Sequence, residues 1–146
     1  MQKEILFQLL EQNRKDCAFF CEKINATNSS FRLTDQTASA GFIYRHIGET
    51  INLIGEFFGY RTTIEGTTMG KQDTGVLYDL DISHNYFEKG YKMLKSLVKN
   101  TTEVAWLEEV DTPWFGKLSR IKLFSLVLFH NSHHCGQISS TILKGN

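Results

Sequence analysis

The chain has 146 residues, a length typical of a single domain, and apolar residues make up 41% of it. Its 16 basic and 16 acidic residues cancel, so the chain should have little affinity for the phosphate backbone of nucleic acids. No apolar run is long enough to span a bilayer, and the N-terminus lacks the pattern of a signal peptide. We therefore expect one domain, residues 1–146, in a cytoplasmic protein that binds neither nucleic acid nor membrane.

The first predicted helix spans residues 2–25, where apolar side chains recur at steps of three and four. It contains Cys17 and Cys21, whose spacing would allow both thiols to bind one metal ion. However, they continue an apolar face that includes Ile5 and Leu9, and free cysteines are commonly buried. We therefore interpret both as core residues. The odd number of cysteines, three in all, argues against a disulfide framework.

The second predicted helix spans residues 35–58, with Thr34 or Asp35 as its N-cap and Gly59 at its C-terminal end. The segment that follows, residues 60–80, is rich in glycine and threonine. A connection of this length can carry the chain along a whole helical bundle. The third helix therefore need not run antiparallel to the second.

Two further helices are predicted over residues 81–98 and 118–143, and either Asp81 or Ser83 is the expected N-cap of the first of them. The segment between these helices is irregular, with short extended stretches expected within residues 101–110. Four amphipathic helices of this length predict an all-α fold, a four-helix bundle with long crossover connections.

Three histidines are candidate metal ligands. His130 and His134 lie one helical turn apart and about 40° around the helix, so both imidazoles can reach one ion. His46 lies on the apolar face of the second helix. Alone it would be interpreted as a core histidine, but a histidine pair on another inward face favours a role as the third ligand. His133 points to the other side of His130 and is not expected to share the ion.

The residues around this histidine pair resemble a known family. The segment FHNSHHCGQI, residues 129–138, is similar to the hallmark of the DinB-like proteins, roughly His, two variable residues, then His-His-Arg-Gly-Gln-Ile. The preceding TPWFG, residues 112–116, and YRHI, residues 44–47, also resemble that family in order and spacing. The resemblance covers nearly the whole chain.

This resemblance implies a four-helix bundle that holds one divalent metal ion through three histidines, which fall on His46, His130 and His134. It also implies a homodimer. Characterised relatives include thiol-dependent transferases and isomerases that use mycothiol or bacillithiol, so a low-molecular-weight thiol is a further expected cofactor. Zinc is our first choice of metal, and imidazole ligands would also suit nickel, iron or manganese.

One position departs from the family motif, because Cys135 stands where the family usually has arginine. Any contact that this arginine makes with a partner subunit or a substrate would be absent or made differently here. The Cys135 side chain should point about 100° away from that of His134. We therefore interpret Cys135 as a packing residue and not as a ligand.

Three neutral imidazoles leave the charge of a metal ion undiminished, so the ion would lower the pKa of bound water toward roughly 7 or hold a thiolate for attack. We expect a metal-dependent thiol S-transferase or hydrolase that acts on a small molecule. The alternative is a non-catalytic metal-binding stress or structural protein, in which the coordination of the ion is closed.

Two polar residues are candidates to support the ligands or line a pocket. Thr50 lies one turn after His46, and Gln137 lies three residues after His134. No carboxylate lies at a spacing that makes it an evident general base, since Glu49 falls only at the margin of the face that carries His46. The sequence does not identify a catalytic side chain.

Overall fold

The computed structural model describes residues 1–146 and confirms the four-helix bundle. The long helices are α1 (Gln2–Cys21), α2 (Ala40–Phe57), α3 (Leu80–Asn100) and α4 (Arg120–Lys144). Between α3 and α4 lie a short 3-10 helix, η1 (Ala105–Leu107), and an antiparallel hairpin of β1 (Glu109–Thr112) and β2 (Gly116–Ser119). None of the helices is both long and apolar enough to cross a membrane.

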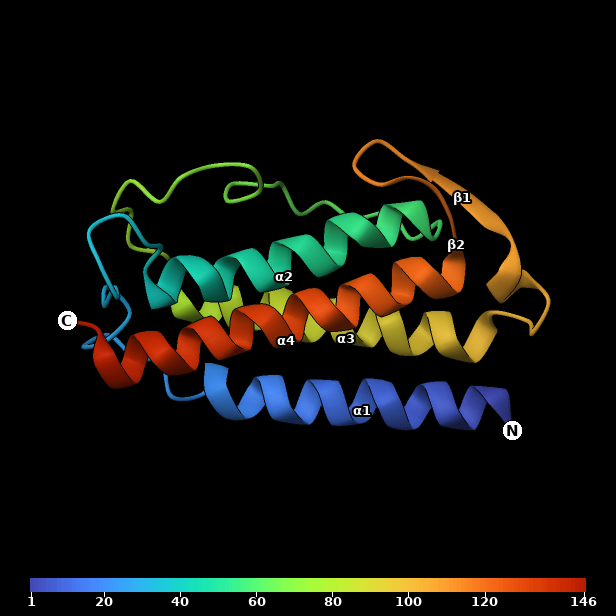
Figure 1. Cartoon of the computed structure of the whole chain (residues 1–146), viewed down its shortest axis with the longest axis horizontal. Coiled ribbons are helices and arrows are strands. Elements are labelled where there is room, and N and C mark those ends of the chain that lie inside the picture. The colour runs from blue at the N-terminus through green and yellow to red at the C-terminus, as the bar shows by residue number, and fades with distance from the viewer.

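The helices do not simply alternate in direction. In Figure 1, α1 and α4 run one way along the bundle, whereas α2 and α3 run the other way. The connection between α2 and α3, residues 58–79, carries the chain back along the whole bundle over its outer side. The other two connections join helices at the same end. The structure therefore confirms that the long glycine- and threonine-rich segment is a crossover.

The start of α2 differs from the prediction, because the chain is capped later than expected. The Ser39 hydroxyl accepts a hydrogen bond from the Phe42 N–H, which makes Ser39 the N-cap instead of Thr34 or Asp35. The Asp73 carboxylate accepts hydrogen bonds from both the N–H and the hydroxyl of Ser39, at 2.8 and 2.7 Å. The crossover thus fixes the point at which α2 begins, which the local sequence does not specify.

The start of α3 differs in the opposite sense, because this helix is capped two to four residues earlier than predicted. The Asp79 carboxylate accepts from the Ile82 N–H at 3.0 Å, so the expected caps Asp81 and Ser83 lie inside the first turn of the helix. The extended stretches expected within residues 101–110 are mostly wrong, because Trp106 is fully buried in η1 against Phe124 of α4, with the ring centroids 5.4 Å apart.

The contact between α2 and α3 is unusually close because it contains glycines. A Cβ atom on Gly48 would lie 2.7 Å from the Cβ of Tyr86, and one on Gly90 would lie 2.6 Å from Cγ2 of Ile51. The Asn52 amide strengthens this contact by donating to the carbonyls of Gly48 and Tyr86, both at 2.8 Å. This packing holds α2, the helix that carries His46, in a fixed position.

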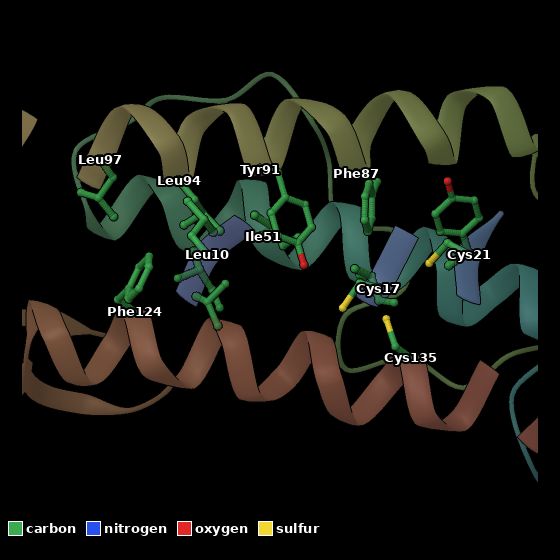
Figure 2. Close-up of a cluster of buried hydrophobic side chains, with 14 of the residues drawn as sticks. Leu10, Cys17, Cys21, Ile51, Phe87, Tyr91, Leu94, Leu97, Phe124 and Cys135 are labelled. Carbon is green, nitrogen blue, oxygen red and sulfur yellow. The ribbon is translucent and has the colours of Figure 1, made fainter. Parts of the chain in front are cut away.

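The core of the bundle is one cluster of 23 buried apolar residues drawn from all four helices (Figure 2). Cys17, Cys21 and Cys135 belong to it, at 1, 1 and 3% exposure, which confirms that they are packing residues. Ile5 and Leu9, expected on the same face, are instead exposed at 55 and 53%. The inward side of α1 is formed one position further along, by residues such as Leu6 and Leu10.

The three thiols lie together between α1 and α4. Figure 2 shows the sulfur of Cys135 directed toward Cys17. A hydrogen bond with Cys135, together with burial, raises the pKa of the Cys17 thiol. A protonated, buried thiol is a poor nucleophile and a poor metal ligand. The position at which the family usually has arginine is therefore part of the apolar core in this chain.

Candidate metal centre

Three histidines from two helices meet beside the core. His46 lies on α2, and His130 and His134 lie one turn apart on α4. The ring centroids are 5.0 Å apart for His46 and His130, 4.7 Å for His46 and His134, and 4.3 Å for the α4 pair. One potential ligand atom of each lies within 4.8 Å of the others. His133 is exposed and lies outside this cluster.

The spacing of the ring nitrogens is compatible with a bound ion. Nε2 of His46 and Nε2 of His130 are 3.1 Å apart. Two imidazole nitrogens bound to tetrahedral zinc at about 2.0–2.1 Å would be separated by about 3.3 Å. A shift of a few tenths of an ångström would therefore convert the observed arrangement into a coordination geometry. The cluster could hold one divalent cation.

The tautomer of His46 is set by a hydrogen-bonded chain that starts at a buried carboxylate. The Thr68 hydroxyl donates to Oε2 of Glu49 at 2.7 Å, and Nδ1 of His46 lies 3.2 Å from the same hydroxyl oxygen. Because the Thr68 proton is committed to Glu49, the hydroxyl oxygen accepts the Nδ1–H of His46. His46 therefore presents an unprotonated Nε2 to the cluster, as a metal ligand must.

Glu49 itself is fully buried and accepts four hydrogen bonds. The backbone N–H groups of Thr67 and Thr68 donate at 2.8 and 2.9 Å, and the two threonine hydroxyls donate at 2.6 and 2.7 Å. This role is not predictable from helical periodicity, because all four donors come from the crossover. The available signal was a glutamate three residues after His46, followed by a threonine-rich loop.

His134 is oriented by Gln137, one of the two predicted support residues. Nδ1 of His134 lies 2.7 Å from the amide oxygen of Gln137, which accepts its proton. This hydrogen bond leaves Nε2 of His134 free to face the other two histidines. The structure thus places Gln137 where its spacing on the helix suggests.

His130 has a weaker acceptor that is itself held by a buried network. Its Nδ1 lies 3.4 Å from the amide oxygen of Asn131, a fully buried residue. The Asn131 amide donates to the Tyr91 hydroxyl at 3.0 Å, and that hydroxyl donates to Asn13 at 2.7 Å. Side chains from α1 and α3 therefore fix the amide beside His130. Each histidine of the cluster has an acceptor near Nδ1, which favours Nε2 as its free nitrogen.

A pocket of about 390 Å³ opens directly on the cluster. His46, His130 and Thr50 lie on its inner side, and the rest of its lining is formed largely by six apolar residues: Ile54, Met69, Trp114, Phe115, Leu126 and Phe129. The Thr50 hydroxyl is buried and has no hydrogen-bond partner. Thr50, the other predicted support residue, therefore lies at the pocket but makes no hydrogen bond to the histidines or to the groups that support them.

The unpartnered hydroxyl of Thr50 predicts an unusual mutational effect. Thr50→Val keeps the shape of the side chain and removes a buried, unsatisfied polar group, so it should raise the free energy of unfolding by about 1 kcal/mol. Thr112→Val is the matched control, because the buried Thr112 hydroxyl donates to the Gly116 carbonyl and accepts from the Phe115 N–H. It should destabilise the protein. Urea unfolding of both variants checks this, and destabilisation by Thr50→Val would contradict it.

The three cluster histidines should make the metal-free protein sensitive to acid. Burial, with smaller contributions from neighbouring histidines, lowers the pKa of His46 to about 4 and that of His130 to about 3. Burial also lowers the pKa of His134. Below the ordinary histidine pKa of about 6.5, the unfolded chain binds protons that the folded chain does not. The free energy of unfolding should therefore decrease as the pH falls from about 6.5 toward 4.

Urea unfolding of the metal-free protein at several pH values between 7.5 and 4.5 measures this dependence. The double variant His46→Gln/His130→Gln lacks both groups and should show a flatter profile. A parent protein whose stability is constant over this range, or a variant with an equally steep profile, would contradict the assignment.

No protein-family model matches the chain, and no curated protein matches it in sequence. Solved structures do match. YfiT from Bacillus subtilis, described as a probable metal-dependent hydrolase with an unusual four-helix bundle topology, aligns over 96% of this chain and 85% of its own, with a TM-score of 0.74 and 13% identity. A DinB-like protein from Bacillus subtilis, YjoA, aligns over 95% of this chain and 90% of its own, with a TM-score of 0.65 and 22% identity. The resemblance to the DinB-like proteins is thus confirmed at the level of the fold, and the chain has the DinB-like four-helix-bundle fold.

Proposed function

We propose that this protein is a divalent-metal-dependent enzyme that acts on a small molecule, with His46, His130 and His134 as the metal ligands. The observation that supports this most strongly is the position of the histidine cluster at the inner end of a pocket. Sites that only stabilise a fold are usually closed by a fourth protein ligand, whereas catalytic sites keep a position open. No fourth histidine, cysteine or carboxylate belongs to this cluster.

The bound cation, the residues that orient its ligands and the pocket lining would each contribute to catalysis. A divalent cation on three neutral imidazoles supplies a Lewis acid that activates a nucleophile or polarises a substrate. Glu49 and Thr68, Gln137, and Asn131 hold the three rings in the tautomer that binds such a cation. The apolar pocket lining restricts the access of water to the reacting groups.

Hydrolysis is the first candidate reaction. YfiT, which has the same fold, is described as a probable metal-dependent hydrolase. The second candidate, thiol S-transfer, is favoured by a feature of the pocket: no carboxylate lines it, and Glu49 is already committed to four hydrogen bonds. Without a neighbouring general base, a thiol is the easier nucleophile to activate, since it loses its proton more readily than water does.

The two reactions can be separated with cobalt-substituted protein, because the visible spectrum of cobalt reports its ligands. A small thiol such as 2-mercaptoethanol should produce a new near-ultraviolet thiolate-to-cobalt band if the open position accepts thiols, which would favour the transferase. A spectrum that ignores the thiol but changes with pH would favour the hydrolase. A spectrum insensitive to both would show a closed site and overturn the enzymatic proposal in favour of a non-catalytic metal-binding protein.

The metal and the assembly state belong to the same proposal. Zinc is our first choice of native metal, with nickel, iron or manganese as alternatives. Comparison of the protein's affinity for each ion, and of its turnover with each ion bound, distinguishes them. We also propose a homodimer, supported only by the resemblance to the DinB-like proteins. Sedimentation equilibrium of the metal-loaded protein should give twice the mass of the chain, and a single-chain mass would contradict it.

A further inference from the structure

We propose that the pocket at the histidine cluster selects a substrate with an uncharged aromatic ring placed next to the group that binds the metal. This inference rests on the proposed function and narrows it, because it names the chemical class of the substrate. It is supported by the aromatic side chains that line the pocket and by the absence of lysine, arginine, aspartate and glutamate from that lining.

The outer part of the pocket is aromatic and comes from two separate segments. Trp114 and Phe115 lie in the turn between β1 and β2, and Phe129 lies on α4 one position before His130. All three are substantially exposed, at 46, 46 and 68%. The Trp114 ring also meets Phe57 of α2 edge-to-face, with the centroids 5.0 Å apart. Exposed aromatic rings gathered around a concave site are typical of surfaces that bind apolar ligands.

The turn that carries two of these rings is held in a defined conformation. The buried Thr112 hydroxyl accepts from the Phe115 N–H at 2.9 Å and donates to the Gly116 carbonyl at 3.1 Å. Gly116 has φ of +66°, a conformation that favours glycine. Trp114 and Phe115 therefore lie at the pocket because of the geometry of the turn, and their rings are positioned before a ligand arrives.

The lining of the pocket contains no lysine, arginine, aspartate or glutamate. Its polar members are Thr50 and the three histidines His46, His130 and His133. A carboxylate or ammonium group on the part of the substrate that lies away from the histidines would lose its water without gaining a partner of opposite charge, which is costly. The pocket therefore favours a ring without charged substituents.

One polar feature lies beside the histidines. Thr50 is 3% exposed, and its hydroxyl has no partner within the protein. Because the hydroxyl oxygen itself is buried, a substrate group would reach it only after a change of the Thr50 rotamer, so the selection argued above does not depend on it. The volume of about 390 Å³ lies within the range of small-ligand sites and suits one ring or two fused rings. Together these features describe an aromatic substrate with a polar, metal-binding group attached directly to the ring.

Two hydroxamic acids test this directly, because they carry the same metal-binding group and differ in the ring. We expect the zinc-loaded full-length protein to bind benzohydroxamic acid at least about tenfold more tightly than acetohydroxamic acid in isothermal titration calorimetry. A para-carboxylate on the benzohydroxamic acid should remove most of this advantage. Trp114→Ala and Phe129→Ala should each reduce the ratio, whereas Leu143→Ala, which removes another exposed apolar side chain that lies outside the pocket, should not.

The outcomes separate this inference from the proposed function. Retention of zinc with equal affinities for both hydroxamic acids would overturn the aromatic-ring assignment and leave the metal-dependent enzyme intact. Failure to retain zinc would overturn both. If the ratio is close to one and Trp114→Ala converts a dimer to single chains, the aromatic surface is a contact between two copies of the chain, which also overturns the assignment.

Discussion

His130→Ala is expected to weaken zinc binding by at least about a hundredfold. The residue supplies one of only three ligands. Structural zinc sites in zinc-finger peptides contribute about 10–16 kcal/mol in total, and on that scale the loss of one ligand should cost about 3 kcal/mol or more. The expected result follows from the convergence of His130 on the other two rings, with Nε2 3.1 Å from Nε2 of His46. Competition against a chelator of known zinc affinity measures the change.

His133→Ala is the matched control for this variant. It removes an imidazole from the same helix, close to the cluster, but His133 is exposed and is not one of the three convergent side chains. Its zinc affinity should remain within about twofold of the parent. Equal losses in both variants would mean that the ion binds elsewhere or that the α4 histidines act only through a general effect on the helix.

Glu49→Ala is expected to have the second large effect, on both stability and metal affinity. It removes the acceptor of four hydrogen bonds from Thr67 and Thr68, including that of the buried Thr68 N–H, which should lower the free energy of unfolding by about 3 kcal/mol. It also frees the Thr68 hydroxyl that holds Nδ1 of His46, and the loss of such an outer hydrogen bond typically weakens metal binding about 10- to 100-fold.

Glu49→Gln separates the geometry of this network from its charge. The amide oxygen can still accept from the Thr67 and Thr68 N–H groups, and the amide nitrogen can donate to the Thr67 hydroxyl. This variant should therefore keep most of the stability while losing part of the metal affinity. Glu56→Ala, at an exposed position of α2, is the control and should change neither quantity. Urea unfolding and zinc competition give the two readings, and a silent Glu49→Ala would contradict the assigned network.

The periodicity of apolar residues predicted the four helices well, because α1, α3 and α4 each bury one side, although α2 is buried on nearly all sides. It failed at the helix ends, where the deciding contacts come from distant parts of the chain. Ser39 begins α2 because Asp73 of the crossover binds it. On α1 the exposed residues Ile5 and Leu9 show a related failure. Because α1 has apolar residues on more than one side, the sequence does not specify which side faces the core. Packing against α3 and α4 determines it.

The candidate site also contains some residues that the sequence predicts and others that it does not. His130, His134 and Gln137 share one face of one helix, so their spacing alone places them together. The approach of His46 to this pair was inferred from its apolar surroundings and from the family resemblance. Glu49 and Thr68 could not be predicted from either, since their contact joins α2 to a loop without periodicity. The same holds for the pocket, whose aromatic rings come from a hairpin turn and a separate helix.

The position of the metal ion tests the central proposal most directly. We would load the protein with one equivalent of zinc and locate the ion by anomalous X-ray diffraction at the zinc absorption edge. We expect a single peak about 2.0–2.1 Å from Nε2 of His46, His130 and His134, with at least one coordination position of the ion facing the pocket. A peak bound by other residues, or none at these histidines in protein that contains stoichiometric zinc, would contradict it.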